Sequence, residues 1–184
     1  DTTGQQDIYN GMENGMQYGM VNFRNTKPLY GIIAAGPLRW LDPIKAILVI
    51  NLFFYLGLTI AAYYMLRLLD FDDKLSVMGT AWIISGYPIL KYGLATGTDV
   101  SGWFFLASTV STFLYGFKFN KPSFFMLASL FGFLGSMSKE TGILSLIFCG
   151  LYLILTYKFS FKLAKSIFYL SSPFFILQGA FMIY

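Results

Sequence analysis

Long apolar segments, separated by short charged breaks, constrain the fold of this chain more than any other feature. Between residues 44 and 69 the only charged residues are Lys45 and Arg67. About 20 consecutive apolar residues are enough for a helix to cross a bilayer. Over the 184 residues, 56% are hydrophobic and 12% are charged, whereas roughly 25% are charged in ordinary soluble domains. We therefore expect an integral membrane protein.

The apolar segments predict the number and position of the membrane helices. The segments that we expect to cross are residues 44–69, 75–90, 100–117, 123–137, 143–157 and 167–184. Asp42 is a candidate N-cap for the first of them, with Pro43 at its first helical position. The predicted fold class is thus all-α: a polytopic helical membrane protein of about six transmembrane helices, with two interfacial helices before them.

The first part of the chain, residues 1–42, is a long polar stretch, and residues 43–184 form the predicted helix bundle. Apolar residues recur at roughly helical spacing near the start, at Tyr9, Met12, Met16, Tyr18, Met20 and Phe23. This pattern predicts an amphipathic helix lying on a membrane surface. Residues 29–40 are apolar but too short to span, and they predict a second interfacial or re-entrant helix.

The distribution of positive charge predicts the orientation. Three connections, residues 67–74, 118–121 and 158–165, together hold seven Lys and Arg, whereas the two connections on the other side hold only Lys91 and Lys139. Cytoplasmic loops carry the excess of Lys and Arg, so residues 1–42 should face the outside of a plasma or inner membrane, or the lumen of the endoplasmic reticulum. Six acids and six bases then gather on that outer side, namely Asp1, Asp7, Glu13, Asp42, Asp99, Glu140 and Arg24, Lys27, Arg39, Lys45, Lys91, Lys139.

Several chemistries are excluded by what the sequence lacks. The chain has no His, which removes histidine nucleophile systems, histidine metal ligands and histidine haem ligation. Its single cysteine, Cys149, cannot form an internal disulfide. There is no Walker A or dinucleotide-binding motif. The chain carries no block of basic residues, so we expect no nucleic-acid partner.

Each candidate polar residue also has a purely structural interpretation. Asp99 at the start of a helix can cap backbone N–H groups and favour the helix dipole. Lys139 and Glu140 can form a neighbouring ion pair, and Lys27 can extend to a lipid headgroup. Their placement together on one side, beside an acid-bearing loop, favours a functional interpretation.

The order of these motifs resembles the GT-C glycosyltransferases, which use polyprenyl-phosphate sugars and include protein O-mannosyltransferases and lipid A aminoarabinose transferases. The matching stretches are Asp1 with Gly4-Gln5-Gln6 and Tyr9, Thr26-Lys27-Pro28-Leu29-Tyr30, Thr98-Asp99 with Trp103-Phe104-Phe105, and Ser138-Lys139-Glu140-Thr141. The resemblance implies that the chain is a fragment that lacks the family's first span.

The resemblance implies a site and a reaction. Asp1 would be the catalytic base, with Asp7 as the reserve candidate. Arg24, Lys27 and Lys139 would bind the donor phosphate, and Tyr30, Asp99 and Glu140 would line the site. We expect inversion at the sugar carbon by an acceptor hydroxyl or amine, with Asp1 taking the acceptor proton and the cations stabilising the departing phosphate. The implied partners are a polyprenyl-phosphate sugar, membrane lipid and other membrane subunits.

The chain departs from the family's pattern at two points. Asp1-Thr2 stands where many members have Asp-Glu, and Asn25-Thr26 stands where a Glu can precede the lysine. Some members bind a metal through Glu and His, and His is absent here. The candidates to hold a divalent cation such as Mg, Mn or Ca are the carboxylates of Asp1, Asp99 and Glu140; no other cofactor is expected.

Two other functions stay open. A non-catalytic GT-C-like subunit of a larger membrane complex would explain the departures at the first motif. An ion or proton carrier would use Asp99 and Glu140 as carboxylates within the membrane. A carrier needs these acids deep in the bundle, whereas a transferase needs them at its outer rim.

Overall fold

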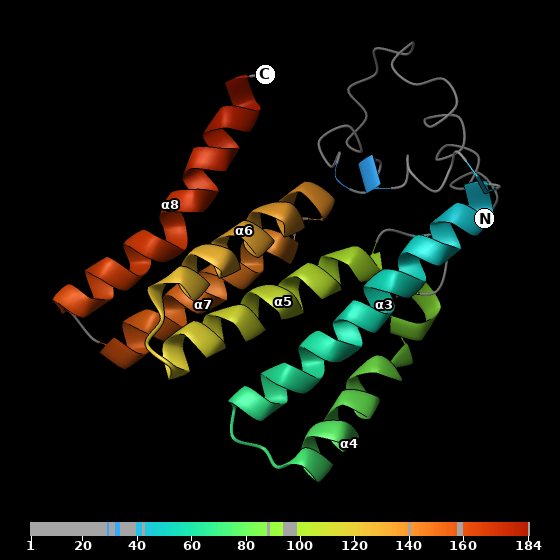
Figure 1. Ribbon diagram of the computed structural model, residues 1–184, viewed down its shortest axis with the longest axis horizontal. Coiled ribbons are helices and arrows are strands. Elements are labelled where there is room, and N and C mark those ends of the chain that lie inside the picture. The colour runs from blue at the N-terminus through green and yellow to red at the C-terminus, as the bar shows by residue number, and fades with distance from the viewer. Residues whose placement is uncertain are drawn as a thin grey trace.

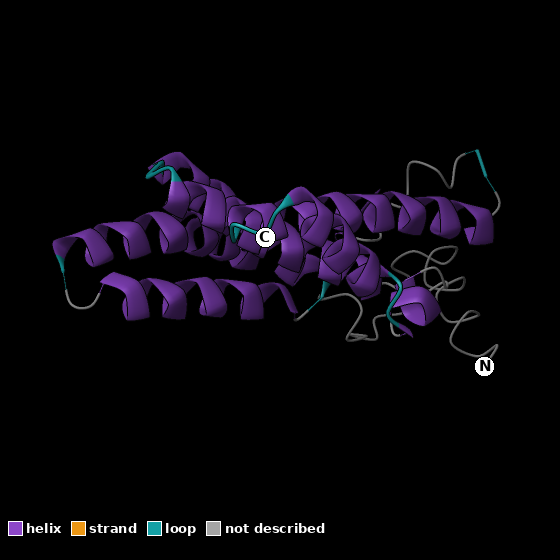
Figure 2. Cartoon of the chain, turned by 90° about the horizontal axis from the view of Figure 1, so that it is seen from below, coloured by secondary structure: helices purple, strands orange, loops and turns teal. Residues whose placement is uncertain are grey.

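A computed structural model describes residues 29, 32–33, 40–41, 43–87, 89–93, 99–139, 141–157 and 160–183. The first predicted interfacial helix and the predicted N-cap Asp42 lie outside the described residues. Of the second, residues 29–40, only Leu29, Ile32 and Ile33, which are helical, and Trp40 are described. The described elements are, in chain order, α3 (Pro43–Leu68), α4 (Asp73–Ile84), the short π-helix η3 (Ile89–Gly93), α5 (Asp99–Lys118), α6 (Pro122–Ser138), α7 (Thr141–Tyr157) and α8 (Phe161–Ile183). All of them are helices, as Figure 2 shows, so the all-α prediction is confirmed for the described part of the chain.

Two described helices are long and apolar enough to cross a membrane. They are residues Lys45–Leu68 of α3, which number 24, and the 20 residues Asp99–Lys118 of α5. Both coincide with predicted spans, and Pro43 opens α3 as expected. The apolar helices α6 and α7 also lie where the sequence predicted helices. With 17 residues each, they are shorter than α3 and α5. The long apolar helices favour a membrane protein, as the composition indicated.

Helix α5 is the centre of the bundle. It lies between α3 on one side and the pair α6 and α7 on the other (Figure 1). Its buried surface is rich in small residues, which let neighbouring backbones approach closely; they are Ser101, Gly102, Ala107, Ser108, Thr109, Ser111 and Gly116. The side of α3 that faces α5 is buried at Ile47, Ile50, Phe54, Leu58 and Ala61. This spacing of three and four residues places them on one face of a helix.

The helices α3 and α5 run parallel. Gly57 lies against the ring of Phe104, and further along both helices the Ser111 hydroxyl donates to the Ala61 carbonyl over 2.8 Å. Helix α4 runs back along α3, with Gly79 packed on Leu66. Because α3 and α5 run in the same direction, the chain between them has to return along the bundle, and α4 is the first part of this return.

The predicted helix 75–90 is wrong in its extent, because α4 ends at Ile84. At 1.5 Å per residue its 12 residues are about 18 Å long, short of the roughly 30 Å of a bilayer core. Pro88 has no N–H to donate to the Ile84 carbonyl four residues earlier. That carbonyl instead accepts from the Tyr55 hydroxyl of α3 over 3.2 Å. The prediction extended the helix through Pro88 because the residues on both sides of this proline are apolar.

The turns after α3 and α5 are built in the same way. Asp70 and Asn120 adopt positive φ values of 67° and 53°, the left-handed conformation that closes many helices. In each turn the next N–H reaches back to a carbonyl five residues earlier, from Phe71 to Leu66 over 3.2 Å and from Lys121 to Gly116 over 2.9 Å. An ion pair joins the two turns, between the Lys118 ammonium and Asp70 Oδ1. These two connections therefore lie at one end of the bundle.

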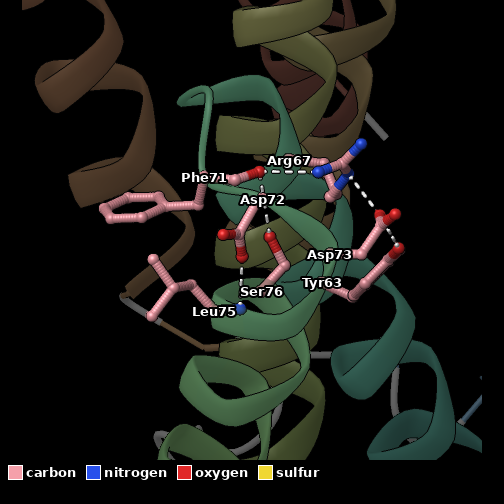
Figure 3. A network of polar contacts seen from close by, with 7 residues as sticks. All are labelled: Tyr63, Arg67, Phe71, Asp72, Asp73, Leu75 and Ser76. Atoms are coloured by element: carbon pink, nitrogen blue, oxygen red, sulfur yellow. Dashed lines mark hydrogen bonds and ion pairs between the residues drawn. The ribbon is translucent and has the colours of Figure 1, made fainter.

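A polar network fixes the corner between α3 and α4 (Figure 3). The Arg67 guanidinium lies 3.1 Å from Asp73 Oδ1 and donates to the Phe71 carbonyl over 2.7 Å. The Tyr63 hydroxyl donates to the same Asp73 oxygen over 3.1 Å. All four residues are at least partly exposed, so the network sits where helices leave the apolar region rather than inside it.

Helix α4 begins with an N-cap in this corner. Asp72 Oδ1 accepts from the Leu75 N–H over 2.7 Å (Figure 3), which satisfies one of the free N–H groups at the helix start. The polar residues that form this corner also interrupt the apolar pattern, which explains why the sequence predicted this break correctly.

The connection between α7 and α8 lies at the same end. The Phe117 and Tyr157 rings are 5.4 Å apart, and the Lys162 ammonium lies 4.6 Å from the Tyr157 ring centroid. The predicted placement of the three basic connections at one end is thus confirmed. The predicted loop 158–165 is wrong in its extent, because α8 begins at Phe161. Ser160 Oγ accepts from the Leu163 N–H over 3.2 Å, so Ser160 caps a helix that contains the two following lysines.

Helix α8 bends near its middle (Figure 1) and contains Pro173. The N–H of the next residue, Phe174, donates to the hydroxyl of the fully buried Ser129 in α6 over 2.9 Å. A proline inside a helix removes a backbone hydrogen bond and kinks the axis. The serine of the neighbouring helix stabilises the backbone at this bend.

Candidate functional site

Two predicted site residues, 40 positions apart, form an ion pair at the end of the bundle opposite the basic connections. The Lys139 ammonium contacts Asp99 Oδ1, with 35% and 30% of the side chains exposed. Asp99 stands in the first turn of α5, and Lys139 is the residue that follows the end of α6. The two helix breaks that carry the predicted motifs are therefore brought together.

The local geometry of the second break aims Lys139 across the bundle. Lys139 has extended backbone angles, with φ −155° and ψ 155°, and its N–H donates to the Gly135 carbonyl over 2.7 Å. Its own carbonyl accepts from the Gly142 N–H over 3.1 Å as α7 begins. These bonds close one helix and open the next within a few residues, and the lysine side chain is left at the rim.

Close contact between two glycines positions this break. A Cβ atom on Gly142 would lie 2.2 Å from the Gly135 carbonyl carbon and from the Ser136 nitrogen. Only glycine permits that approach of α7 to α6. The stretch Gly132-Phe133-Leu134-Gly135 is typical of close helix packing, whereas nothing in the sequence marks Gly142 as the contact of Gly135.

A buried pair of hydroxyls lies beneath the ion pair. Ser101 Oγ and Ser138 Oγ are hydrogen bonded to each other, and their residues are 0% and 3% exposed. Each serine is within two residues of one member of the ion pair. Ser101 was not predicted as a site residue; the available signal was a hydroxyl two residues after Asp99, in an otherwise apolar helix start.

The aromatic residues that follow Asp99 belong to the core. Phe105 is 5% exposed and its ring lies 5.8 Å from the ring of Phe54 in α3. The Phe104 ring lies 5.5 Å from the same Phe54 ring. These contacts anchor the beginning of α5 to α3, so the aromatic part of the motif supports the site from behind.

The other predicted site residues lie outside the described residues. They are Asp1, Asp7, Arg24, Lys27, Tyr30 and Glu140, and their roles stay predictions. Of the three metal candidates, only Asp99 is described, and one of its oxygens is bound by Lys139. Within the described ranges, no three His, Cys, Asp or Glu side chains gather into a group that could hold a metal ion.

The ion pair can do two things chemically. It holds a cation at the rim of an apolar bundle, where an incoming phosphate can compete with Asp99 for the ammonium. The Asp99 carboxylate can also accept a hydrogen bond from a hydroxyl ligand.

Comparison of the chain with protein-family models, with curated proteins and with solved structures finds no match. The proposed function therefore rests on the geometry of the candidate site.

Proposed function

We propose that this chain is the core of a membrane-embedded glycosyltransferase that moves a sugar from a polyprenyl-phosphate donor to an acceptor. The proposal includes six membrane crossings, in a plasma, inner or endoplasmic reticulum membrane, with residues 1–42 facing outside or into the lumen. The observation that carries it is the Asp99–Lys139 ion pair, which joins the two predicted motif breaks at one rim. Helix α3 begins at this same end, because Ile47 and Ile50 pack with Val100.

The depth of the ion pair favours a transferase over an ion or proton carrier. Both charged groups stand at helix ends, and about a third of each side chain is exposed. A carrier needs an ionisable group within the bundle that can be reached from both sides. The hydroxyls of Ser101 and Ser138 bond to each other beneath the pair, and within the described residues no charged group continues the path inward.

In the proposed reaction, an acceptor oxygen or nitrogen forms a bond to the anomeric carbon while the bond from that carbon to the phosphate oxygen breaks. The acceptor proton passes to a carboxylate, for which Asp1 is the proposed base. The departing polyprenyl phosphate gains negative charge, which Lys139 can stabilise together with Arg24 and Lys27. Asp99 positions Lys139 before the donor arrives.

A non-catalytic subunit of a larger membrane complex is the second candidate, and the short helix α4 favours it. Because α4 ends at Ile84, the first half of α3 keeps large apolar side chains exposed, with Phe53 at 71% and Leu56 at 51%. On α4 itself Trp82 is 83% exposed. Apolar surfaces of this extent contact either lipid or another protein.

The experiment that decides between these functions measures label transfer from a panel of polyprenyl-phosphate sugars by the full-length protein in membranes. We compare the unaltered protein with Asp99→Asn and Lys139→Gln, and with Asp1→Asn and Lys27→Ala. Each site variant should lower kcat/KM by about 100-fold or more, in the range of a lost electrostatic contact in an active site.

The matched control is the Lys118–Asp70 ion pair, at the other end of the bundle. Asp70→Asn and Lys118→Gln remove the same charges from a similar pair and should leave transfer unchanged. Loss of transfer in the site variants alone, at equal expression, supports the transferase. Transfer that survives substitution of Asp99 and Lys139 would show that this rim is not the catalytic centre and would favour the subunit.

A further inference from the structure

Three exposed lysines stand at the end of the bundle opposite the candidate site, at the turns α5–α6 and α7–α8. We name Lys121, Lys162 and Lys165 the basic corner. Within the described ranges, none of them forms an ion pair with a carboxylate. The acids of this end are instead Asp70, which Lys118 binds, and Asp72 and Asp73 at the start of α4. The end of the bundle thus has a charge-balanced corner at α3–α4, where Arg67, Lys74 and Lys118 offset the three acids, and a basic corner.

Aromatic rings hold two of these lysines in place. The Lys162 ammonium lies 4.6 Å from the Tyr157 ring centroid, and Tyr157 packs 5.4 Å from Phe117. The Lys121 ammonium lies 5.7 Å from the Tyr115 ring, itself 4.4 Å from Phe124. At an exposed site a ring face attracts an ammonium weakly, and it does not accept a conventional hydrogen bond from it. The three N–H donors of each ammonium are therefore still available to an anion.

The surface next to Lys162 and Lys165 is apolar along the helices. Phe161 is 86% exposed and Phe168 is 64% exposed on α8, and on α7 Leu155 is 82% and Leu151 is 54% exposed. A ligand that satisfies this surface needs an anionic head for the lysines and a long apolar tail for the helices. Free inorganic phosphate has no such tail, and an acidic peptide would leave these side chains uncovered.

We propose that the basic corner binds the phosphate headgroup of an anionic phospholipid, whose acyl chains lie along the exposed faces of α7 and α8. Aromatic side chains at the level of the headgroups and lysines directed at the phosphate are the arrangement that membrane interfaces favour. At the α3–α4 corner the bases offset the acids, so the preference is confined to the basic corner. This inference requires the bundle to be embedded in a membrane but is independent of sugar transfer.

The test is native mass spectrometry of the full chain, released from detergent micelles that contain phosphatidylglycerol and phosphatidylcholine with the same acyl chains in equal amounts. We expect bound phosphatidylglycerol to exceed phosphatidylcholine. A lysine near a membrane surface contributes about 1 kcal/mol toward an anionic lipid, or about fivefold in affinity. The double variant Lys162→Gln/Lys165→Gln should therefore lower the ratio of the two bound lipids by about 25-fold.

Two further variants keep the result interpretable. Lys45→Gln/Lys74→Gln removes the same charge from exposed positions at the other end and at the α3–α4 corner, and it should keep the lipid preference. Lys162→Arg/Lys165→Arg retains the charge and should keep the preference too, which would show that the positive charge is what the lipid recognises. If the Gln pair does not fold, Lys121→Gln alone should lower the ratio by about fivefold.

Three outcomes would overturn the proposal. Equal loss in both Gln pairs would show an effect of net charge alone. Equal binding of the two lipids by the unaltered chain would show that no such site exists. Displacement of the lipid by millimolar inorganic phosphate would show an anion site that does not use the acyl chains. None of these outcomes bears on transfer activity, which the Asp99 and Lys139 variants test separately.

Discussion

At the scale of single residues, the ion pair between Asp99 and Lys139 should stabilise the fold as well as form the site. Each partner is only about one-third exposed, so a lone charge would keep part of its desolvation cost. In a double-mutant cycle with Asp99→Asn and Lys139→Gln, we expect a coupling energy of about 1 kcal/mol, at the upper end for exposed pairs. Unfolding in mixed micelles, followed by tryptophan fluorescence, measures it.

The pair formed by Lys118 and Asp70 gives the comparison for this cycle. The Asp70 side chain is 81% exposed, and solvent screens such a charge more strongly. Its coupling energy should be smaller than that of the rim pair. A larger coupling energy for Lys118 and Asp70 would contradict the expectation that the less exposed pair is the more strongly coupled one.

Gly142 and Gly150 offer a second test at this scale, within one helix. A Cβ atom at Gly142 would lie 2.2 Å from the backbone of α6, whereas a Cβ atom at Gly150 would meet nothing within 4 Å. Gly142→Ala should lower the free energy of unfolding by at least about 2 kcal/mol, as overpacking does. Gly150→Ala should leave it unchanged or raise it by up to about 1 kcal/mol through helix propensity. The same unfolding assay measures both, and equal effects would contradict the close approach of α6 and α7.

The sequence placed Asp99 and Lys139 on one face of the protein, because polar breaks between apolar helices must lie at helix ends. It did not predict that they bind each other: Lys139 was expected beside Glu140 and as a phosphate ligand. Which of several charges at one rim meet depends on the packing of α5 against α6. That packing depends on Gly135, whose use in close helix packing the sequence indicates, and on Ser101 and Ser138, whose role the linear pattern does not reveal.

At the scale of the element, the bend in α8 predicts a non-additive pair of substitutions. Pro173 interrupts the helix, and Ser129 of α6 accepts the Phe174 N–H over 2.9 Å. Ser129→Ala should lower the free energy of unfolding by about 1 kcal/mol, the net value of one hydrogen bond. In a Pro173→Ala background that cost should shrink, because residue 173 regains its own N–H and a straighter α8 depends less on the contact with Ser129. A thermodynamic cycle of the four proteins gives the difference.

Ser172→Ala is the control for this cycle. Ser172 is on the same helix beside the proline, and it is only half-buried. Its substitution should have a smaller effect that does not depend on residue 173. If Ser129→Ala costs the same with and without the proline, the contact does not stabilise the bend.

Helix boundaries were predictable where one strong signal acted alone. Pro43 opens α3 and the Ser138–Gly142 break divides α6 from α7, as the sequence indicated. The predictions failed where two signals competed. Apolar residues on both sides of Pro88 suggested one span, although the proline leaves the Ile84 carbonyl without a helical donor. At α8 the lysines suggested a loop, although Ser160 is a good N-cap and lysine is a good helix former.

At the scale of the whole molecule, the direction of the helices alternates. The contact of Lys118 with Asp70 and that of Phe117 with Tyr157 place the ends of α3, α5 and α7 together. Helices α4, α6 and α8 run back from that end. The Asp99–Lys139 pair lies at the other end, where α5 begins and α6 stops. One end therefore holds the basic corner, and the other holds the candidate site.

This arrangement predicts which positions share a side of the membrane. In a Cys149→Ser background, single cysteines at Lys74, Lys121 and Lys165 should react together with a membrane-impermeant maleimide, and a cysteine at Lys45 should react from the opposite side. All four positions are exposed, and Cys149 is fully buried, so its replacement removes only background. Because basic ends face the cytoplasm, intact cells should label the Lys45 position, and the other three should need permeabilisation. The reverse pattern would keep the bundle but place the Asp99–Lys139 pair on the cytoplasmic face, and a donor sugar would then have to be presented from inside. Labelling of all four positions in sealed cells would contradict the membrane-crossing arrangement itself.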